Sequence, residues 1–214
     1  MLKVYGADLS SPANKVRFVA NFLEMDYEYI RISLKNGEHK KEDYLKIHPA
    51  GKIPSIDDEG FTLFESDTIC KYLASREKSS LYPTDIKQRA IVDQWVDFST
   101  IHIGVAMGKV LFNKVFAPIV GVPVDEQSMN DGYMFLSRYL PVLEGVLGKN
   151  KYLASGCLSL ADMTLLATLD PLEVSGVEFD TYKNICQWRN SLKKESFYTK
   201  CHNSYGEVLK RFKK

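Results

Sequence analysis

The sequence predicts an α/β domain followed by an all-α domain. The first is predicted because residues 1–77 alternate short β-type runs with amphipathic helical runs, and two of the β-type runs flank a hairpin signal. The second is predicted because helical periodicity continues after residue 86 with no convincing strand. Ser79–Asp85, between the two, has the turn chemistry of a linker. We therefore expect domains at 1–78 and 87–214, joined by a linker at 79–86.

The first half is predicted as a small mixed sheet with helices on its faces. A strand–helix–strand unit closes most easily as a right-handed parallel crossover, and the hairpin signal Asp57–Gly60 adds antiparallel strands. Val16, Val19 and Leu23 share one face of the first helix, which begins at Ser11. In chain order we expect a strand at 2–5, a helix at 11–24, a strand at 27–32, a short helix at 40–47, strands at 54–56 and 61–64, and a helix at 66–76.

The second half is predicted as helices throughout. Apolar residues step by four and three from Met129 to Leu143, which is typical of an amphipathic helix, and Pro141 is expected to kink it. Ser159 and Asp162 have the spacing of a capping box at the start of another helix. The remaining helices are expected at 87–116, around 185–192 and at 205–212.

Composition excludes several classes of function. A net charge of +1 on 214 residues gives no strong field for nucleic acid or an anionic membrane. We expect no signal peptide, because the first residues read as a strand, and we expect no apolar run to approach the length of a membrane span. Four cysteines without a Cys-x-x-Cys pair predict reduced thiols in the cytoplasm, and four scattered histidines predict no metal site.

Ser10 and Ser11 lie where the first strand gives way to the first helix. One interpretation is structural: Ser11 is the N-cap and Ser10 fills the turn. The other is an anion site, in which a hydroxyl and free backbone N–H groups converge at the positive end of a helix.

Three further segments have polar chemistry of the same kind. A cis Ile53–Pro54 bond after Lys52 would let the main chain of Ile53 pair with an extended ligand, and an ordinary trans turn is the alternative. Glu65-Ser66 is either another helix cap or a site for an ammonium and a carboxylate. His39, Lys40 and Lys41 form either a solvated face or a carboxylate site. Together the segments suit a ligand with two carboxylates, an amine, central peptide groups and an anion, as in glutathione.

The chain resembles the soluble glutathione transferases of the serine type, most closely the phi class, with theta, delta and zeta nearby. The resemblance covers essentially the whole chain. Its motifs are Lys3–Gly6 followed by Ser10–Val16, Gly37–Lys41, His48–Pro54, Phe61–Ser66, Leu81–Pro83, Tyr152–Ala154 and Ser159–Asp162.

The resemblance implies a thioredoxin-like N-terminal domain, an all-α C-terminal domain and a homodimer that uses glutathione as co-substrate in detoxification. It implies that Ser10, with Ser11 as the alternative, is the catalytic hydroxyl that stabilises the glutathione thiolate. The implied glutathione-binding residues are His39, Lys40, Lys52, Ile53, Pro54, Glu65 and Ser66. An electrophile site is expected between the domains, although these apolar residues also fit a core: Met107, Leu111, Phe112, Val115 and Phe116.

Two departures and two alternatives remain. Theta and delta members have Cys-Arg where this chain has Ala13-Asn14, so Lys15 and Arg17 are candidates for the missing cation. Serine at position 10, with no cysteine before Cys70, argues against a thiol exchanger. A glutathione-dependent isomerase, dehalogenase or peroxidase would use the same fold. A non-catalytic binding module is the alternative from another class, and the intact set of site residues argues against it.

Overall fold

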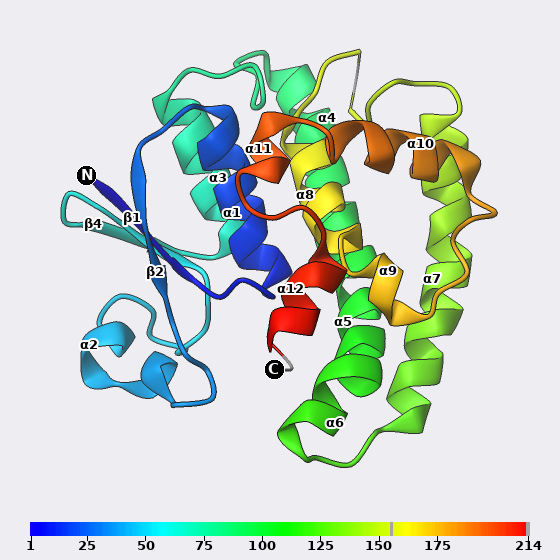
Figure 1. The fold of residues 1–214 in the computed structure, drawn as a ribbon. Coiled ribbons are helices and arrows are strands. Elements are labelled where there is room, and N and C mark those ends of the chain that lie inside the picture. Colours follow the sequence, from blue (N-terminus) through cyan, green and yellow to red (C-terminus); the bar gives the residue numbers. More distant parts are fainter. Residues whose placement is uncertain (155, 213–214) are drawn as a thin grey trace.

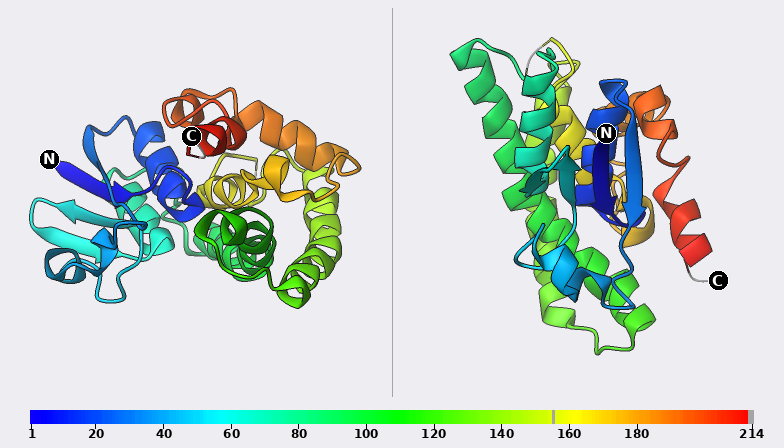
Figure 2. Two further views of the ribbon diagram at one scale, coloured as in Figure 1. Left: turned by 60° about the horizontal axis from the view of Figure 1, so that its bottom comes forward. Right: turned by 90° about the vertical axis from the view of Figure 1, so that its left-hand side faces the viewer.

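A computed structural model of the protein describes residues 1–154 and 156–212. It confirms the predicted fold class, since a four-stranded mixed sheet of thioredoxin-like topology is followed by a helical half. The two halves lie side by side, with the sheet on one side of the molecule (Figures 1 and 2).

The sheet has the strand order β2-β1-β3-β4. The pair β1–β2 is parallel, and the pairs β1–β3 and β3–β4 are antiparallel, as the crossover and the hairpin signal predict. Glu59 and Gly60 join β3 to β4, and both have positive φ, of 55° and 94°, which suits a two-residue hairpin turn. The strands are β1 (Leu2–Gly6), β2 (Tyr27–Arg31), β3 (Ser55–Asp58) and β4 (Phe61–Phe64).

Helices α1 and α3 of the first half pack against each other, and α1 also packs against α8 of the helical half. The short α2 lies away from the helical half (Figure 1). Two helix starts differ by one residue from the interpretation as simple serine caps: Ser10 is the N-cap instead of Ser11, and Glu65 holds the N-cap position before Ser66. The helices of this half are α1 (Ser11–Phe22), η1 (Glu38–Lys40), α2 (Glu42–Leu45) and α3 (Ser66–Arg76).

Within the described residues, the second half contains helices and no strand. Its long helix α7 continues through Pro141. The helices are α4 (Ile86–Asp97), η2 (Phe98–Gly104), α5 (Val105–Leu111), η3 (Phe112–Phe116), α6 (Ala117–Val120), α7 (Glu126–Leu147), α8 (Leu160–Leu169), α9 (Leu172–Ser175), α10 (Lys183–Leu192), α11 (Ser196–Thr199) and α12 (Tyr205–Phe212).

The segments from α4 to α6 form one continuous helix, Ile86–Val120, of 35 residues. By length and composition alone it is apolar enough to cross a membrane, which corrects the expectation that no run approaches such a span. Core helices of soluble proteins pass the same test, and 39% of its most apolar window is buried inside this structure.

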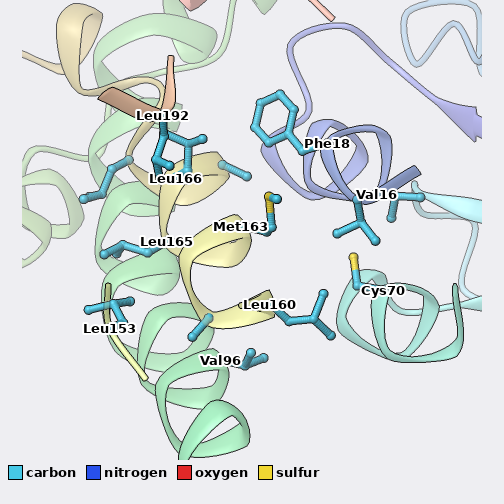
Figure 3. Packing of buried hydrophobic residues seen from close by; sticks show 14 of the residues in the cluster. Val16, Phe18, Cys70, Val96, Leu153, Leu160, Met163, Leu165, Leu166 and Leu192 are labelled. Carbon is cyan, nitrogen blue, oxygen red and sulfur yellow. The ribbon is translucent and has the colours of Figure 1, made fainter. Parts of the chain in front are cut away.

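One hydrophobic core runs through both halves. Val16 of α1 and Cys70 of α3 lie beside Leu160 and Met163 of α8, and Phe18 of α1 belongs to the same cluster (Figure 3). Burial of this shared core fixes α1 between the sheet and the helical half, and so fixes the position of its N-terminus.

Asp162 stabilises α8 from inside that core. Its carboxylate, 0% exposed, accepts the Ser159 amide at 3.1 Å and the Ser159 hydroxyl at 3.0 Å. It also accepts the Leu153 amide at 3.0 Å and the Trp188 indole N–H at 3.1 Å. The predicted capping box is therefore confirmed, and it is extended by two bonds from other segments.

Candidate active site

The sheet topology brings the polar segments to one edge. Tyr5, near the end of β1, pairs with Ser55, the first residue of β3, and Ser55 pairs with Phe64, the last residue of β4. Tyr5 also pairs with Ile30 near the end of β2. The loop after β1 carries Ser10, and the segment after β2 carries residues 38–40. The segment before β3 carries Lys52–Pro54, and the turn after β4 carries Glu65-Ser66. Residues that the sequence separates by more than fifty positions therefore share one side of the molecule.

Ser10 caps helix α1 through its side chain. The Ser10 Oγ accepts the Ala13 amide at 3.3 Å, and the Ser10 carbonyl accepts the Asn14 amide at 2.9 Å. In this arrangement the hydroxyl oxygen uses a lone pair, so its proton remains able to bond an anion. Ser10 and Ser11 are both partly exposed at the positive end of a twelve-residue helix.

The Lys52 segment is held by a buried tyrosine. Tyr44, which is 5% exposed, donates its hydroxyl to the Lys52 carbonyl at 2.6 Å and accepts the Ser55 hydroxyl at 3.1 Å. The Ile53–Pro54 bond is cis, as one of the two interpretations predicted. The Lys52 side chain is exposed, Ile53 is partly exposed and Pro54 is buried.

Gly51 brings the His39 segment against the Lys52 segment. Its φ is +58°, and a Cβ there would lie 2.8 Å from the His39 carbonyl oxygen, so a larger residue would force the two segments apart. His39 is partly exposed and Lys40 is exposed. Three cationic or potentially cationic side chains, His39, Lys40 and Lys52, therefore come from adjacent stretches of chain.

Glu65 occupies an unusual backbone conformation between β4 and α3. Its φ is 69°, its side chain is exposed, and Ser66 begins the helix beside it. The preceding Phe64 packs on the ring of His48, with 4.8 Å between ring centroids, and His48 stacks on Tyr44 at 6.5 Å. Burial lowers the pKa of His48 below its usual value, and the negative charge of Glu65 opposes that shift.

Lys15 and Arg17 do not supply a free cation at this edge. Lys15 is 4% exposed and pairs with the Asp67 carboxylate, which also accepts the Thr100 hydroxyl at 2.9 Å. Arg17 is 7% exposed, lies 4.2 Å from the Tyr29 ring centroid and 3.8 Å from Asp8. Asp67 lies 52 positions from Lys15, and the partners of Arg17 come from the loop before α1 and from β2. No pattern within α1 therefore showed that these charges are already paired.

The expected electrophile residues differ in exposure. Met107 and Val115 are buried, at 3% and 6% exposure, whereas Phe112 is 48% exposed. Leu111 and Phe116 are partly exposed. All five belong to the continuous helix from Ile86 to Val120. Among the described residues, no group of three or more His, Cys, Asp or Glu side chains could hold a metal ion.

Sequence reasoning missed two hydrogen-bond donors to this edge. Tyr44 falls in the short helix predicted at 40–47 and was given no role there, although a buried tyrosine normally needs a partner for its hydroxyl. Asn14 donates to the carbonyl of Asp8, two residues before Ser10, at 2.9 Å. Its position in the first turn of α1 was the available signal.

Comparisons with known proteins agree with this geometry. The family model described as the glutathione S-transferase N-terminal domain matches residues 1–75, and that of the C-terminal domain matches residues 113–195. A curated rice protein, the probable glutathione S-transferase GSTF2 of Oryza sativa subsp. japonica, is 31% identical over 195 residues, which are 89% of this chain and 91% of the relative.

Two solved structures are similar over nearly their whole length. Glutathione transferase F2 from Populus trichocarpa has a TM-score of 0.88 at 30% identity, covering 99% of this chain and 100% of that one. Glutathione S-transferase I from maize, solved with an atrazine glutathione conjugate, has a TM-score of 0.86 at 29% identity, covering 94% of this chain and 95% of that one.

Proposed function

Since the chain belongs to the glutathione S-transferase family, we propose that it ionises the thiol of bound glutathione and directs the thiolate at small hydrophobic electrophiles. In this account residues 1–78 bind glutathione, residues 87–214 carry the electrophile site, and residues 79–86 link the two. The observation that carries the proposal is the convergence of Ser10, Lys52 and Glu65 at one edge of the sheet.

Ser10 is the proposed thiol-activating residue. A free thiol titrates near pH 8.5, so about 3% is thiolate at neutral pH, and lowering its pKa by about two units needs roughly 2.7 kcal/mol. A hydrogen bond to a charged group contributes about 1.5–3 kcal/mol, and a helix N-terminus about 0.3–1 kcal/mol. The hydroxyl bond is therefore the larger contribution. Its geometry supports this role, because the Ser10 oxygen accepts from Ala13 and its proton can be donated to sulfur.

The rest of glutathione is proposed to lie along the same edge. Glu65 binds the ammonium and Ser66 the carboxylate of the γ-glutamyl end, at the N-terminus of α3. The main chain of Ile53, beside Pro54, pairs with the central peptide groups, and Lys52 adds a charge. His39 and Lys40 bind the glycine carboxylate. The close approach of Gly51 to the His39 carbonyl supports the proposal that the His39 and Lys52 segments bind neighbouring parts of glutathione.

The electrophile is proposed to bind on the helical side of the thiol. Phe112, Leu111 and Phe116 are the accessible members of the expected set, and the buried Met107 and Val115 support them from below. An apolar surface at this position would favour apolar electrophiles over charged ones.

A cytoplasmic homodimer completes the proposal. Apolar side chains are exposed along the helix Ile86–Val120 and on the edge strand β4, which a second copy of the chain would cover. These exposed residues are Phe61, Phe64, Ile86, Ile91, Ile101 and Val105. The mass of the protein by light scattering after gel filtration tests this, since a monomer at micromolar concentration would reject it.

The decisive experiment is retention of the purified protein on immobilised glutathione, followed by conjugation of a chlorinated aromatic. We expect specific elution by free glutathione and formation of the conjugate with release of chloride. A protein that is retained but does not conjugate a chlorinated aromatic, reduce a hydroperoxide or isomerise a cis-enone acid would be a binding module instead. A protein that is not retained would contradict the glutathione site itself.

A further inference from the structure

The C-terminal helix contacts the loop that carries Ser10. Tyr205, the first residue of α12, is 0% exposed and donates its hydroxyl to the Leu9 carbonyl at 2.8 Å. The two residues are 196 positions apart. Helix α12, although it is close to the C-terminus in the sequence, therefore lies beside the start of α1 in space (Figure 1).

Three successive carbonyl groups in the Ser10 loop accept hydrogen bonds. The Ala7 carbonyl accepts the Ser10 amide at 2.9 Å, and the Asp8 carbonyl accepts the Asn14 side chain at 2.9 Å. Both donors are local. The third carbonyl, that of Leu9, accepts from Tyr205. Because a peptide group is planar, fixing the Leu9 carbonyl also fixes the direction of the Ser10 amide and limits where the Ser10 side chain can point.

Tyr205 is itself held in place by the helical half. The Gly206 amide donates to the Glu173 carboxylate at 2.6 Å, and Glu173 also accepts the Lys193 ammonium at 3.1 Å. Three residues earlier, His202 lies 2.8 Å from the Asp170 carboxylate. The chain on either side of Tyr205 is therefore anchored to the segment around α9. These contacts fix the position from which the Tyr205 hydroxyl bonds to the Leu9 carbonyl.

We propose that Tyr205 is a positioning residue for thiol activation: its hydrogen bond to the Leu9 carbonyl keeps the Ser10 hydroxyl aimed at the glutathione sulfur. This inference rests on the proposed function. Hydrogen bonds weaken steeply as distance and angle depart from their optimum, so a small rotation of the Leu9–Ser10 peptide lowers the stabilisation of the thiolate. Glutathione binding depends on other segments and is largely unaffected.

The test compares Tyr205→Phe with Tyr133→Phe. Tyr133 makes an equivalent bond, from its hydroxyl to the Ser175 carbonyl at 2.8 Å, within the helical half. The pKa of the bound glutathione thiol is read from its thiolate ultraviolet absorbance against pH, beside the glutathione dissociation constant and the melting temperature. For Tyr205→Phe we expect a thiol pKa higher by about 0.5–1 unit, turnover at acidic to neutral pH lower by about three- to tenfold, and little change in dissociation constant.

Tyr133→Phe is expected to leave the thiol pKa at its wild-type value. An unchanged thiol pKa in Tyr205→Phe, or an equal shift in both variants, overturns the inference and leaves the proposed function intact. Wild-type protein that binds glutathione without lowering its thiol pKa overturns the proposed function instead. If Tyr205→Phe does not fold, Glu173→Gln loosens the anchor at Gly206 while keeping the tyrosine, and the same direction of shift is required.

Discussion

The Ser10 hydroxyl oxygen accepts the backbone N–H of Ala13 at 3.3 Å. This contact makes Ser10 the cap of α1 and still leaves its hydroxyl proton available to an anion, because capping uses only an oxygen lone pair. The structural and the catalytic interpretations of the serine pair are therefore compatible at position 10.

Replacing Ser10 by Ala is expected to lower turnover strongly at neutral pH while glutathione still binds. The acid limb of the pH–rate profile should move to higher pH, because the thiol loses a hydrogen bond that favours its charged form. Loss of the cap should also lower the free energy of unfolding by about 0.5–2 kcal/mol. Ser11→Ala is the control and Ser10→Thr restores the hydroxyl. An unchanged pH–rate profile in Ser10→Ala would reject the assignment.

Replacing Glu65 by Gln is expected to raise the KM for glutathione roughly 10- to 100-fold, since a hydrogen-bonded charge pair with the ammonium is lost. Turnover at saturating glutathione should stay near wild type. Glu59→Gln is a matched control, because Glu59 is also exposed and also has a positive φ, at the other end of β4. Equal effects of the two variants in steady-state kinetics would show that Glu65 does not contact glutathione.

Removal of the Tyr44 hydroxyl tests the support of the peptide-binding segment. Tyr44→Phe leaves the Lys52 carbonyl without its donor, so we expect the KM for glutathione to rise about 2- to 10-fold. The maximal rate and the thiol pKa should remain unchanged. Tyr72→Phe serves as the control, because that hydroxyl bonds to Asp58 at the opposite edge of the sheet. The hypothesis fails if Tyr44→Phe alters only stability, as Tyr72→Phe should.

Asp162 is predicted to matter for folding instead of chemistry. Asp162→Ala leaves the Trp188 indole and two backbone amides without an acceptor, and each buried unpaired donor costs about 1–3 kcal/mol. The loss in unfolding free energy, measured by urea titration, should exceed that of Asp85→Ala. Asp85 is an exposed cap of α4 whose carboxylate accepts only the Gln88 amide among the described bonds, and its loss should cost about 0.5–2 kcal/mol. Equal losses would contradict the account of the buried carboxylate.

Local patterns in the sequence predicted much of the fold. The bounds of β4 agree with expectation, and α3 ends near Arg76 as expected, because turn residues and periodicity mark these segments. Asp162 was identified from spacing alone. In contrast, the cap of α3 was assigned to Ser66, whereas Glu65 holds the N-cap position. Glu65 has a positive φ, which a non-glycine residue does not signal in the sequence.

Contacts between distant segments could not be predicted in the same way. The pairing of Lys15 with Asp67 spans 52 positions, and that of Tyr205 with Leu9 spans 196. The first joins α1 to α3 within the N-terminal half, and the second depends on how the helical half packs beside the start of α1, so no local pattern contains either contact. The residues proposed to bind glutathione were predicted from their motifs, whereas the hydrogen bonds of Tyr44 to Lys52 and of Tyr205 to Leu9 became visible only in the folded chain.

A crystal structure of the protein with glutathione measures the central claim most directly, through the distance between the glutathione sulfur and the two serine oxygens. We predict the sulfur within hydrogen-bonding distance of the Ser10 hydroxyl, with the γ-glutamyl end at Glu65 and Ser66. A sulfur bonded to Ser11 instead, or out of reach of both serines, would contradict the account.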